Sequence, residues 1–294
     1  MLSTKAPSYW KTNVVLAPYS TYKIGGEARL LTTVENQEQF KEALLYCLKH
    51  QIPYYILGNG SNTLFEDRGF DGAVIVNKLN FFEREGSLIY AGSGISFPKL
   101  GVQTARLGLS GLEYAAGVPG TLGGALYMNA GANGQEIKDL VEEVEFMDPK
   151  GGVHVLSKDQ LLFKYRWSCF HLAKGVLLAA KLKLTESTNA REIQKAYLLK
   201  RQETQPLKEH SCGCVFRNEK EVSAGALIDQ LGLKGTQIGG AQISERHANF
   251  IVNKGEAKSQ DVLDLVTLIE TKAFETKNLK LQREIRFVPF KGDL

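Results

Sequence analysis

The alternation of apolar and polar positions divides the chain into short strands and amphipathic helices. Residues 36–50 (NQEQFKEALLYCLKH) carry apolar side chains at helical spacing, and Asn36 stands at the expected N-cap. Apolar runs at 53–57 (PYYIL) and 72–77 (GAVIVN) predict strands, and the loop GNGSN at 58–62 lies between them. The first 80 residues therefore predict a βαβ-type unit broken by a Gly/Asn/Ser turn.

The same mixture of elements continues to the end of the chain. Strands are predicted at 87–92, 176–185, 249–253 and 281–288, helices at 96–109 (with Ser96 as cap), 187–204, 223–233 and 259–277, and a hairpin at 141–148 and 151–157. A polar connector with Pro206 follows the long charged helix, and a domain boundary is expected near it. The pattern as a whole predicts two or three α+β domains.

Composition and charge narrow the class of protein. The chain has 294 residues, of which 43% are hydrophobic and 23% are charged, as in ordinary globular proteins. The net charge of +4 gives weak support for an anionic ligand, but Lys and Arg are interspersed, so no nucleic-acid partner is expected. The apolar runs are too short for a membrane span, and the N-terminus lacks an apolar signal core. We therefore expect a cytoplasmic protein without a membrane partner.

Two stretches concentrate the glycines: LGNGSNTLF at 57–65 and GLEYAAGVPGTLGGALYMNAGANG at 111–134. Neither matches a P-loop or the dinucleotide fingerprint G-x-G-x-x-G between a strand and a helix. Glycines beside Ser, Thr and Asn leave backbone N–H groups accessible and permit positive φ, so such loops can form anion-binding sites. The same composition also serves tight turns and close packing, and the residues alone leave both interpretations open.

The segment HSCGCVFRN at 210–218 holds two of the four cysteines. A metal site needs more ligands than Cys212 and Cys214 supply, and Cys-x-Cys is not a usual zinc spacing, so no metal is expected. A disulfide between residues two apart would be strained, and a reducing cytosol would disfavour it. A reactive thiol and a pair of buried small apolar side chains both remain.

Several segments in family order resemble the UDP-N-acetylenolpyruvoylglucosamine reductase (UDP-N-acetylmuramate dehydrogenase) family. They are STYKIGGEA (20–28), the two glycine-rich stretches, YRWS (165–168), GCVFRN (213–218), SAGALIDQLGLKG (223–235), IGGAQISERHANFIVN (238–253) and REIRFV (283–288). The resemblance covers nearly the whole chain. The compact region between 185 and 213 resembles the subtype that lacks an extra substrate-capping loop and its tyrosine.

The resemblance implies an α+β fold of three parts. Residues 1–70 and 71–204 would form a two-part FAD-binding region of the vanillyl-alcohol-oxidase (PCMH) type. Residues 205–294 would form a C-terminal α+β substrate domain that closes over the substrate. FAD would be bound without a covalent link, because the segments 58–62 and 117–131 contain neither His nor Cys. We expect a monomer.

The implied activity is a flavoprotein oxidoreductase reaction of peptidoglycan synthesis, which serves cell wall biogenesis, cell shape and cell division. NADPH reduces FAD and leaves, and enolpyruvyl-UDP-GlcNAc (UDP-N-acetyl-3-O-(1-carboxyvinyl)-glucosamine), the UDP-sugar partner, enters. Flavin N5 then delivers hydride to C3, charge spreads from C2 into the carboxylate, and a proton reaches C2 to give UDP-N-acetylmuramate. Such a site needs a cation for the enolate and a positioned acid.

The family motifs place three residues in these catalytic roles. Arg166 matches the arginine of the YR motif, and its planar fork suits a carboxylate that gains charge. Glu284 matches a glutamate that helps stabilise the enolic intermediate. Cys214 stands where most members have a serine that protonates C2. A thiol, with an ordinary pKa of about 8.5, is an adequate acid; nearby arginines would lower that pKa and apolar burial would raise it. Each residue taken singly has another interpretation. Arg166 also fits a surface cation, Glu284 a solvated ion-pair partner, and Cys214 a buried small side chain.

The motifs also assign binding residues. The FAD pyrophosphate is expected on Gly58, Asn59, Gly60, Ser61 and Asn62, and further flavin contacts on Gly117, Pro119, Gly120, Thr121, Gly123, Gly124, Ala125, Asn129 and Gly131. Substrate contacts are expected from Tyr165, Asn218, His247 and Arg201. Two other readings stay open: a flavin oxidase or dehydrogenase of the same fold acting on a small alcohol or hydroxy acid, and a non-enzymatic flavin- or nucleotide-binding module.

Overall fold

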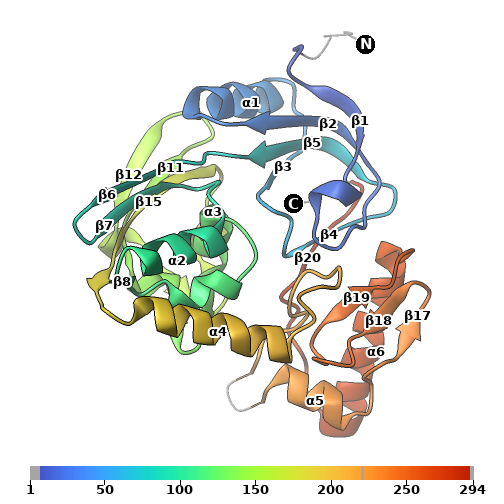
Figure 1. Cartoon of the computed structure of the whole chain (residues 1–294). Coiled ribbons are helices and arrows are strands. Elements are labelled where there is room, and N and C mark those ends of the chain that lie inside the picture. Colours follow the sequence, from blue (N-terminus) through green and yellow to red (C-terminus); the bar gives the residue numbers. More distant parts are fainter. Residues whose placement is uncertain (1–6, 220–221, 292–294) are drawn as a thin grey trace.

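The computed structural model describes residues 7–219 and 222–291. Three parts are visible in Figure 1: an N-terminal sheet covered by helix α1, a second sheet with helices α2 and α3 on one side, and a C-terminal lobe built around helices α5 and α6. Helix α4 runs below the second part toward the C-terminal lobe. The mixture of sheets and helices agrees with the predicted α+β class.

The first sheet has the strand order β1-β2-β5-β3. Its strands are β1 (Lys11–Val15), β2 (Glu27–Val34), β5 (Phe70–Asn77) and β3 (Tyr54–Leu57). Strands β2 and β3 both pair in parallel with β5, and helix α1 (Gln37–Lys49) connects β2 to β3, which confirms the βαβ-type unit. The sheet continues past residue 70, where the sequence placed a domain boundary, because β5 begins there and belongs to this sheet.

Helix α1 and strand β5 follow directly from their apolar patterns. Asn36 caps α1, since its side-chain Oδ1 accepts a hydrogen bond of 2.9 Å from the N–H of Gln39. The buried side chains of α1 recur at helical spacing and face the sheet: Phe40, Ala43, Leu44 and Cys47. Strand β5 is apolar at successive positions because both of its faces are covered, with Ile75 in one core cluster and Val74 in another.

The second sheet is antiparallel, with the order β12-β11-β15-β7-β6. Its strands are β6 (Phe82–Glu85), β7 (Leu88–Gly92), β11 (Val141–Met147), β12 (Val153–Ser157) and β15 (Val176–Lys183). The helices of this part are α2 (Phe97–Arg106), α3 (Leu122–Met128) and α4 (Ala190–Thr204). Ser96 precedes α2 as predicted, although its side chain makes no capping hydrogen bond. The predicted hairpin of β11 and β12 is present.

The C-terminal lobe packs two helices against a small sheet. Its elements are α5 (Ala224–Gln230), β17 (Gln237–Ile238), β18 (Ala241–Ile243), β19 (Ile251–Asn253), α6 (Ser259–Lys277) and β20 (Arg286–Val288). The helix predicted at 259–277 has these bounds, whereas the strand predicted at 281–288 is formed only over its last three residues.

Strand β20 joins the C-terminal lobe to the N-terminal part of the chain. It pairs in parallel with β4 (Thr63–Phe65), the strand that follows the GNGSN loop. Tyr22, Ile24 and Leu64 pack into the core of the lobe. The carboxylate of Asp67 accepts hydrogen bonds of 2.8 and 2.9 Å from the backbone N–H and the hydroxyl of Ser259. The lobe is therefore fixed to the segment that carries the first glycine-rich loop.

Short elements complete the chain. They are strands β8 (Leu109–Ser110), β9 (Gly131–Ala132), β10 (Gln135–Glu136), β13 (Phe163–Lys164), β14 (Trp167–Ser168) and β16 (Thr185–Glu186), and 3-10 helices at Ala17–Tyr19, Glu113–Gly117, Ile137–Asp139, Lys158–Gln160 and Cys169–His171. Within the described ranges 7–219 and 222–291, no helix has both the length and the apolar character needed to cross a bilayer.

Candidate active site

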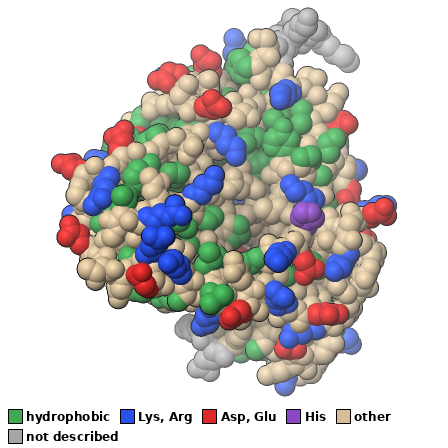
Figure 2. Space-filling model, viewed as in Figure 1, with side chains coloured by type: hydrophobic (Ala, Val, Ile, Leu, Met, Phe, Trp, Pro, Cys, Tyr) green, Lys and Arg blue, Asp and Glu red, His purple; other side chains and the backbone are tan. Residues whose placement is uncertain are grey.

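A cavity of about 920 Å³ lies where the three parts of the molecule meet. Its wall includes the first glycine-rich loop, residues of the second, the end of α4, and Cys214 and Glu284 of the C-terminal lobe. On the face shown in Figure 2, Lys and Arg side chains gather near the middle. A cavity of this size holds a cofactor or substrate of several hundred daltons.

The two glycine-rich loops are bonded to each other at the cavity wall. The Asn59 side-chain amide donates to the carbonyl of Gly120 (2.9 Å), and the Ser61 hydroxyl donates to the carbonyl of Pro119 (3.0 Å). A Cβ atom at Gly58 would lie 2.6 Å from the hydroxyl oxygen of Thr121, so glycine is required there by close approach. The two stretches, far apart in the sequence, thus form one cradle.

Arg166 and Glu284 form an ion pair at the cavity wall. Arg166 lies in the tight turn between β13 and β14 with φ of +53°, a left-handed conformation that is uncommon for a side chain larger than glycine and that occurs at functional sites. Its Nε lies 3.0 Å from Oε1 of Glu284, and Nη2 donates to the carbonyl of Gly131. The two side chains are only 21% and 18% exposed. The pair therefore differs from the solvated surface ion pair that was the competing reading of both residues.

Burial decides the protonation of Cys214. Burial is the largest cause of a rise in the pKa of this thiol to about 12, and the nearby Glu284 carboxylate is the second. Arg166 and Arg201 act in the opposite direction and lower the pKa. Of the two opposing effects considered from the sequence, burial therefore prevails. Because the pKa lies far above neutrality, Cys214 carries its proton at pH 7 and can donate it into the cavity that it lines.

Cys212 has a different environment. It is 3% exposed and packs in the core of the C-terminal lobe with Val215 and Phe216. Both cysteines are free thiols. Across the described residues, no group of three or more His, Cys, Asp or Glu side chains is placed to hold a metal ion. Cys212 is thus a small buried side chain of the lobe core at the edge of the cavity lining, whereas Cys214, which also lines the cavity, is only partly buried.

Arg201 reaches the cavity from helix α4. A Cβ atom at Gly117 would lie 2.4 Å from Cδ of Arg201, so Gly117 leaves room for this arginine instead of lining the cavity itself. The Nε of Arg201 is buried, and no hydrogen-bond partner is found for it in the described part of the chain. Burial lowers the pKa of its guanidinium. An unpaired buried cation at a cavity wall is suited to an anionic ligand.

Two predicted ligand residues have structural roles in this arrangement. Asn129 is fully buried and ends helix α3 in the left-handed conformation. Its side chain donates to the carbonyl of Lys164 and accepts from the N–H of Lys138, so it braces the turn that carries Arg166. Asn218 is exposed, and its Oδ1 accepts from the N–H of Ala224 at the start of α5. Neither residue lines the cavity.

Two further predicted substrate residues lie just outside the cavity lining. Tyr165 is 44% exposed, and its ring centroid lies 4.8 Å from the guanidinium carbon of Arg166. His247 is partly buried against the ring of Phe250 in the C-terminal lobe. Tyr165 contacts the catalytic candidate Arg166, and His247 contacts Phe250, which itself lines the cavity.

The sequence analysis missed a stack of side chains on the cavity wall. The ring centroids of Tyr127 and His171 lie 4.0 Å apart, and the guanidinium carbon of Arg286 lies 4.9 Å from the centroid of the Tyr127 ring. The Nη1 group of Arg286 donates a hydrogen bond to the Tyr127 hydroxyl. Burial, followed by Arg286, lowers the pKa of His171 to about 4, so this ring is neutral at pH 7. Tyr127 and Arg286 lie within quoted motifs, whereas His171 lies outside them and gave no signal.

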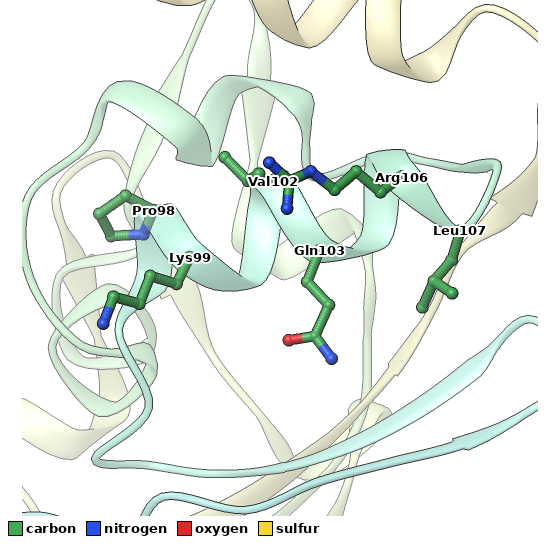
Figure 3. A pocket seen from close by; sticks show the side chains of 6 residues that line it. All are labelled: Pro98, Lys99, Val102, Gln103, Arg106 and Leu107. Carbon is green, nitrogen blue, oxygen red and sulfur yellow. The ribbon is translucent and has the colours of Figure 1, made fainter.

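A smaller depression of about 580 Å³ lies on the surface of helix α2. Figure 3 shows its lining, which consists of Pro98, Lys99, Val102, Gln103, Arg106 and Leu107. None of the residues that the sequence singled out belongs to it. The three catalytic candidates Arg166, Cys214 and Glu284 all line the larger cavity instead.

Two known families match separate segments of the chain. Residues 28–157 match the family described as "FAD binding domain". Residues 205–288 match the family described as "UDP-N-acetylenolpyruvoylglucosamine reductase, C-terminal domain". The first match contains both glycine-rich loops, and the second contains Cys214 and Glu284. These matches confirm the expected FAD-binding region.

Relatives of known name match nearly the whole chain. A protein of Protochlamydia amoebophila (strain UWE25) named UDP-N-acetylenolpyruvoylglucosamine reductase is 46% identical over 97% of this chain and 96% of its own length. A protein of the same name from Chlamydia pneumoniae is 42% identical over 95% of this chain and 92% of its own length. The crystal structure of the enzyme from Thermus caldophilus is 39% identical, has a TM-score of 0.80, and covers 93% of this chain and 97% of that chain. The chain therefore belongs to the UDP-N-acetylenolpyruvoylglucosamine reductase family.

Proposed function

We propose that this protein reduces enolpyruvyl-UDP-GlcNAc to UDP-N-acetylmuramate, with NADPH as reductant and FAD as carrier. The observation that carries the proposal is the convergence of Arg166, Glu284 and Cys214 on a cavity that the double glycine-rich cradle also lines. FAD, when bound, supplies the transfer of hydride from NADPH to C3 of the enol ether. Side chains of the protein itself bind the substrate and supply the proton.

Arg166 is suited to hold the carboxylate of the substrate. When C3 gains hydride, negative charge spreads from C2 into that carboxylate, and a guanidinium held in advance stabilises it without reorganisation. The contacts of Arg166 with Glu284 and with the carbonyl of Gly131 fix its orientation. Cys214, protonated because of its raised pKa, then donates its proton to C2 from one defined side.

The cradle fits a cofactor with an extended phosphate chain. Gly58 and Gly60 allow no side chain, and the cross-loop bonds of Asn59 and Ser61 hold the backbone in place. We propose that 58–62 binds the pyrophosphate. The second loop, through Pro119, Gly120, Thr121, Gly123, Gly124, Ala125 and Gly131, would contact the rest of the flavin.

Replacing Gly60 with alanine should weaken FAD binding by at least tenfold. Gly60 has φ of +62°, and a Cβ atom there would lie 2.5 Å from the carbonyl oxygen of Tyr19, so the loop must shift. The matched control is Gly86→Ala, since Gly86 has φ of +58° with no atom near the added Cβ and carries only the left-handed penalty of about 1–2 kcal/mol. Flavin fluorescence quenching measures the affinity. Equal affinities in the two variants would contradict the cradle.

The remaining contacts are proposed as parts of the UDP-sugar site. We assign Arg201 to the diphosphate, because it is a cation at the cavity wall without an ion-pair partner in the described part of the chain. Tyr165 would act through Arg166, while Asn218 and His247 of the C-terminal lobe would meet the distal part of the substrate as that lobe closes. We further propose a cytoplasmic monomer of the subtype without the tyrosine loop.

Stopped-flow spectroscopy of the bound flavin tests this function. NADPH should bleach the flavin without the sugar nucleotide, and enolpyruvyl-UDP-GlcNAc should restore its colour without oxygen. A flavin oxidase of the same fold would be reduced by a small alcohol or hydroxy acid and reoxidised by oxygen instead. Protein that carries no flavin would favour the non-enzymatic module. Either outcome would overturn the proposal.

A further inference from the structure

Arg217 lies beside Glu284 on a short two-stranded ladder behind the cavity. The N–H of Glu284 donates to the carbonyl of Val215 (2.7 Å), the N–H of Arg217 donates to the carbonyl of Gln282 (2.9 Å), and Phe216 and Arg283 form an antiparallel bridge between these contacts. In such a pair, residues two positions apart share a face, and diagonal neighbours lie within reach of long side chains. Arg217 and Glu284 are diagonal neighbours of this kind.

The backbone beneath Arg217 is held on both sides. The buried side chain of Asn249 accepts from the N–H of Phe216 (2.9 Å) and donates to the carbonyl of Phe216 (2.8 Å). The N–H of Val215 donates to the carbonyl of Asn249. The segment from Cys214 to Arg217 therefore has little freedom to move relative to Glu284.

Arg217 is a cation without an ion-pair partner in the ranges 7–219 and 222–291, within the distance of a direct salt bridge. Its Nε is buried, and no hydrogen bond to it is found among the described residues. A buried N–H of this kind is costly unless a negative charge lies nearby. Glu284 supplies such a charge, and its Oε1 is in direct contact with Arg166 of the β13–β14 turn.

We propose that Arg217 is a positioning residue that, together with Arg166, holds Glu284 as a carboxylate between two guanidinium groups. Burial raises the pKa of Glu284 above its ordinary value, and the charges of Arg166 and then Arg217 oppose this rise. The charge on Glu284 in turn raises the pKa of Cys214, which Arg166 and Arg201 lower. Arg217 would thus act through Glu284, whose charge adds to the effect of burial on the pKa of Cys214.

The charged and titratable groups around Glu284 come from every element that meets there. They are Arg166 of the β13–β14 turn, Cys214 and Arg217 of the loop before α5, Arg201 of α4, Arg286 of β20 and His171 of the 3-10 helix, which is neutral at pH 7. Removing Arg217 leaves Arg166 as the cation in direct contact with Glu284. The pKa of Glu284 should therefore rise.

The test compares Arg217→Met, which removes the charge but keeps an unbranched side chain, with Arg217→Lys, which keeps the charge. In protein labelled with ¹³C at glutamate carboxyls, the Glu284 signal is the one absent from Glu284→Gln. Its titration midpoint should rise by about one pH unit in the methionine variant and stay near that of the wild type in the lysine variant. A thermal melt and the flavin absorbance of each holoenzyme report folding. If Arg217→Met does not fold, Arg217→Gln takes its place.

A second readout rests on the proposed function. In the pH profile of flavin reoxidation by enolpyruvyl-UDP-GlcNAc, the pKa that disappears in Glu284→Gln should move upward in Arg217→Met, while the profile of flavin reduction by NADPH stays in place. A folded, flavin-loaded Arg217→Met or Arg217→Gln with an unmoved Glu284 midpoint would overturn the inference. So would an Arg217→Lys variant whose Glu284 midpoint rises as much as in Arg217→Met. A wild-type enzyme that the sugar nucleotide does not reoxidise would overturn the function alone, because the titration needs no substrate.

Discussion

Replacement of Cys214 with alanine should slow the second half-reaction by about 10²- to 10⁴-fold, the usual contribution of a positioned acid. Alanine has no proton to give, so the charge that develops at C2 of the substrate would have to await a proton from water. Flavin reduction by NADPH should keep its rate, because it transfers hydride and needs no acid from this residue. Single-turnover stopped-flow measurements resolve the two half-reactions.

Two control variants separate chemistry from packing at this position. Cys214→Ser keeps a proton donor of the kind found in most of the family and should retain much of the second half-reaction. Cys212→Ala removes the neighbouring buried thiol, so it should lower stability by about 1 kcal/mol through the small cavity left behind and leave both half-reactions in place. Near wild-type rates in both half-reactions of Cys214→Ala would exclude Cys214 as the acid.

Loss of the Arg166 charge should also act mainly on the second half-reaction. Arg166→Met should slow reoxidation by about 10²- to 10³-fold, as expected when a preorganised donor to a developing anion is removed. The reoxidation rate of Arg166→Lys should lie between those of the wild type and Arg166→Met. Lysine keeps the charge but lacks the planar fork that contacts Glu284 and the carbonyl of Gly131 together. The rate of reoxidation at saturating substrate is the measurement.

Arg106→Met provides the matched control, because Arg106 lines the depression on α2 and not the cavity. It should leave both half-reactions unchanged. Arg166→Met should also lower the melting temperature, since Glu284 is 18% exposed and would lose its direct ion-pair partner. An equal loss in both half-reactions would contradict the assignment of Arg166 to the enolate and point to a role in holding the cofactor.

Local pattern was sufficient for most of the elements, whereas the roles proposed for Arg166, Glu284 and Cys214 rest on the family motifs. Helices α1 and α6 and strand β5 follow from apolar spacing and end signals. The strand expected at 281–288 is split, because its first half pairs with the 215–217 segment and its last three residues pair with β4. Such pairing between distant segments leaves no trace in the apolar pattern of either one.

Two of the predicted ligand residues also have structural roles that were partly readable from the sequence. Asn129 follows a helical run and takes the left-handed conformation that asparagine adopts at helix ends, so its position after ALYM already suited a C-cap. Asn218 likewise makes a local bond to the start of α5. His171 and Arg217 acquire their surroundings from segments distant in the sequence, and nothing adjacent to them in the sequence indicates it.

The parallel pairing of β20 with β4 has a consequence for how the protein is made. The side chain of Asn62, at the end of the cofactor loop, donates to the carbonyl of Glu284, 222 residues further along the chain. At a synthesis rate of 5–20 residues per second, the loop emerges from the ribosome roughly 10–45 s before the residues that hold it. Closing so large a loop is also a slow step once the chain is complete. The cofactor cradle should therefore be among the last parts of the nascent protein to mature, and until then strand β4 is an unpaired edge exposed to aggregation and to proteases.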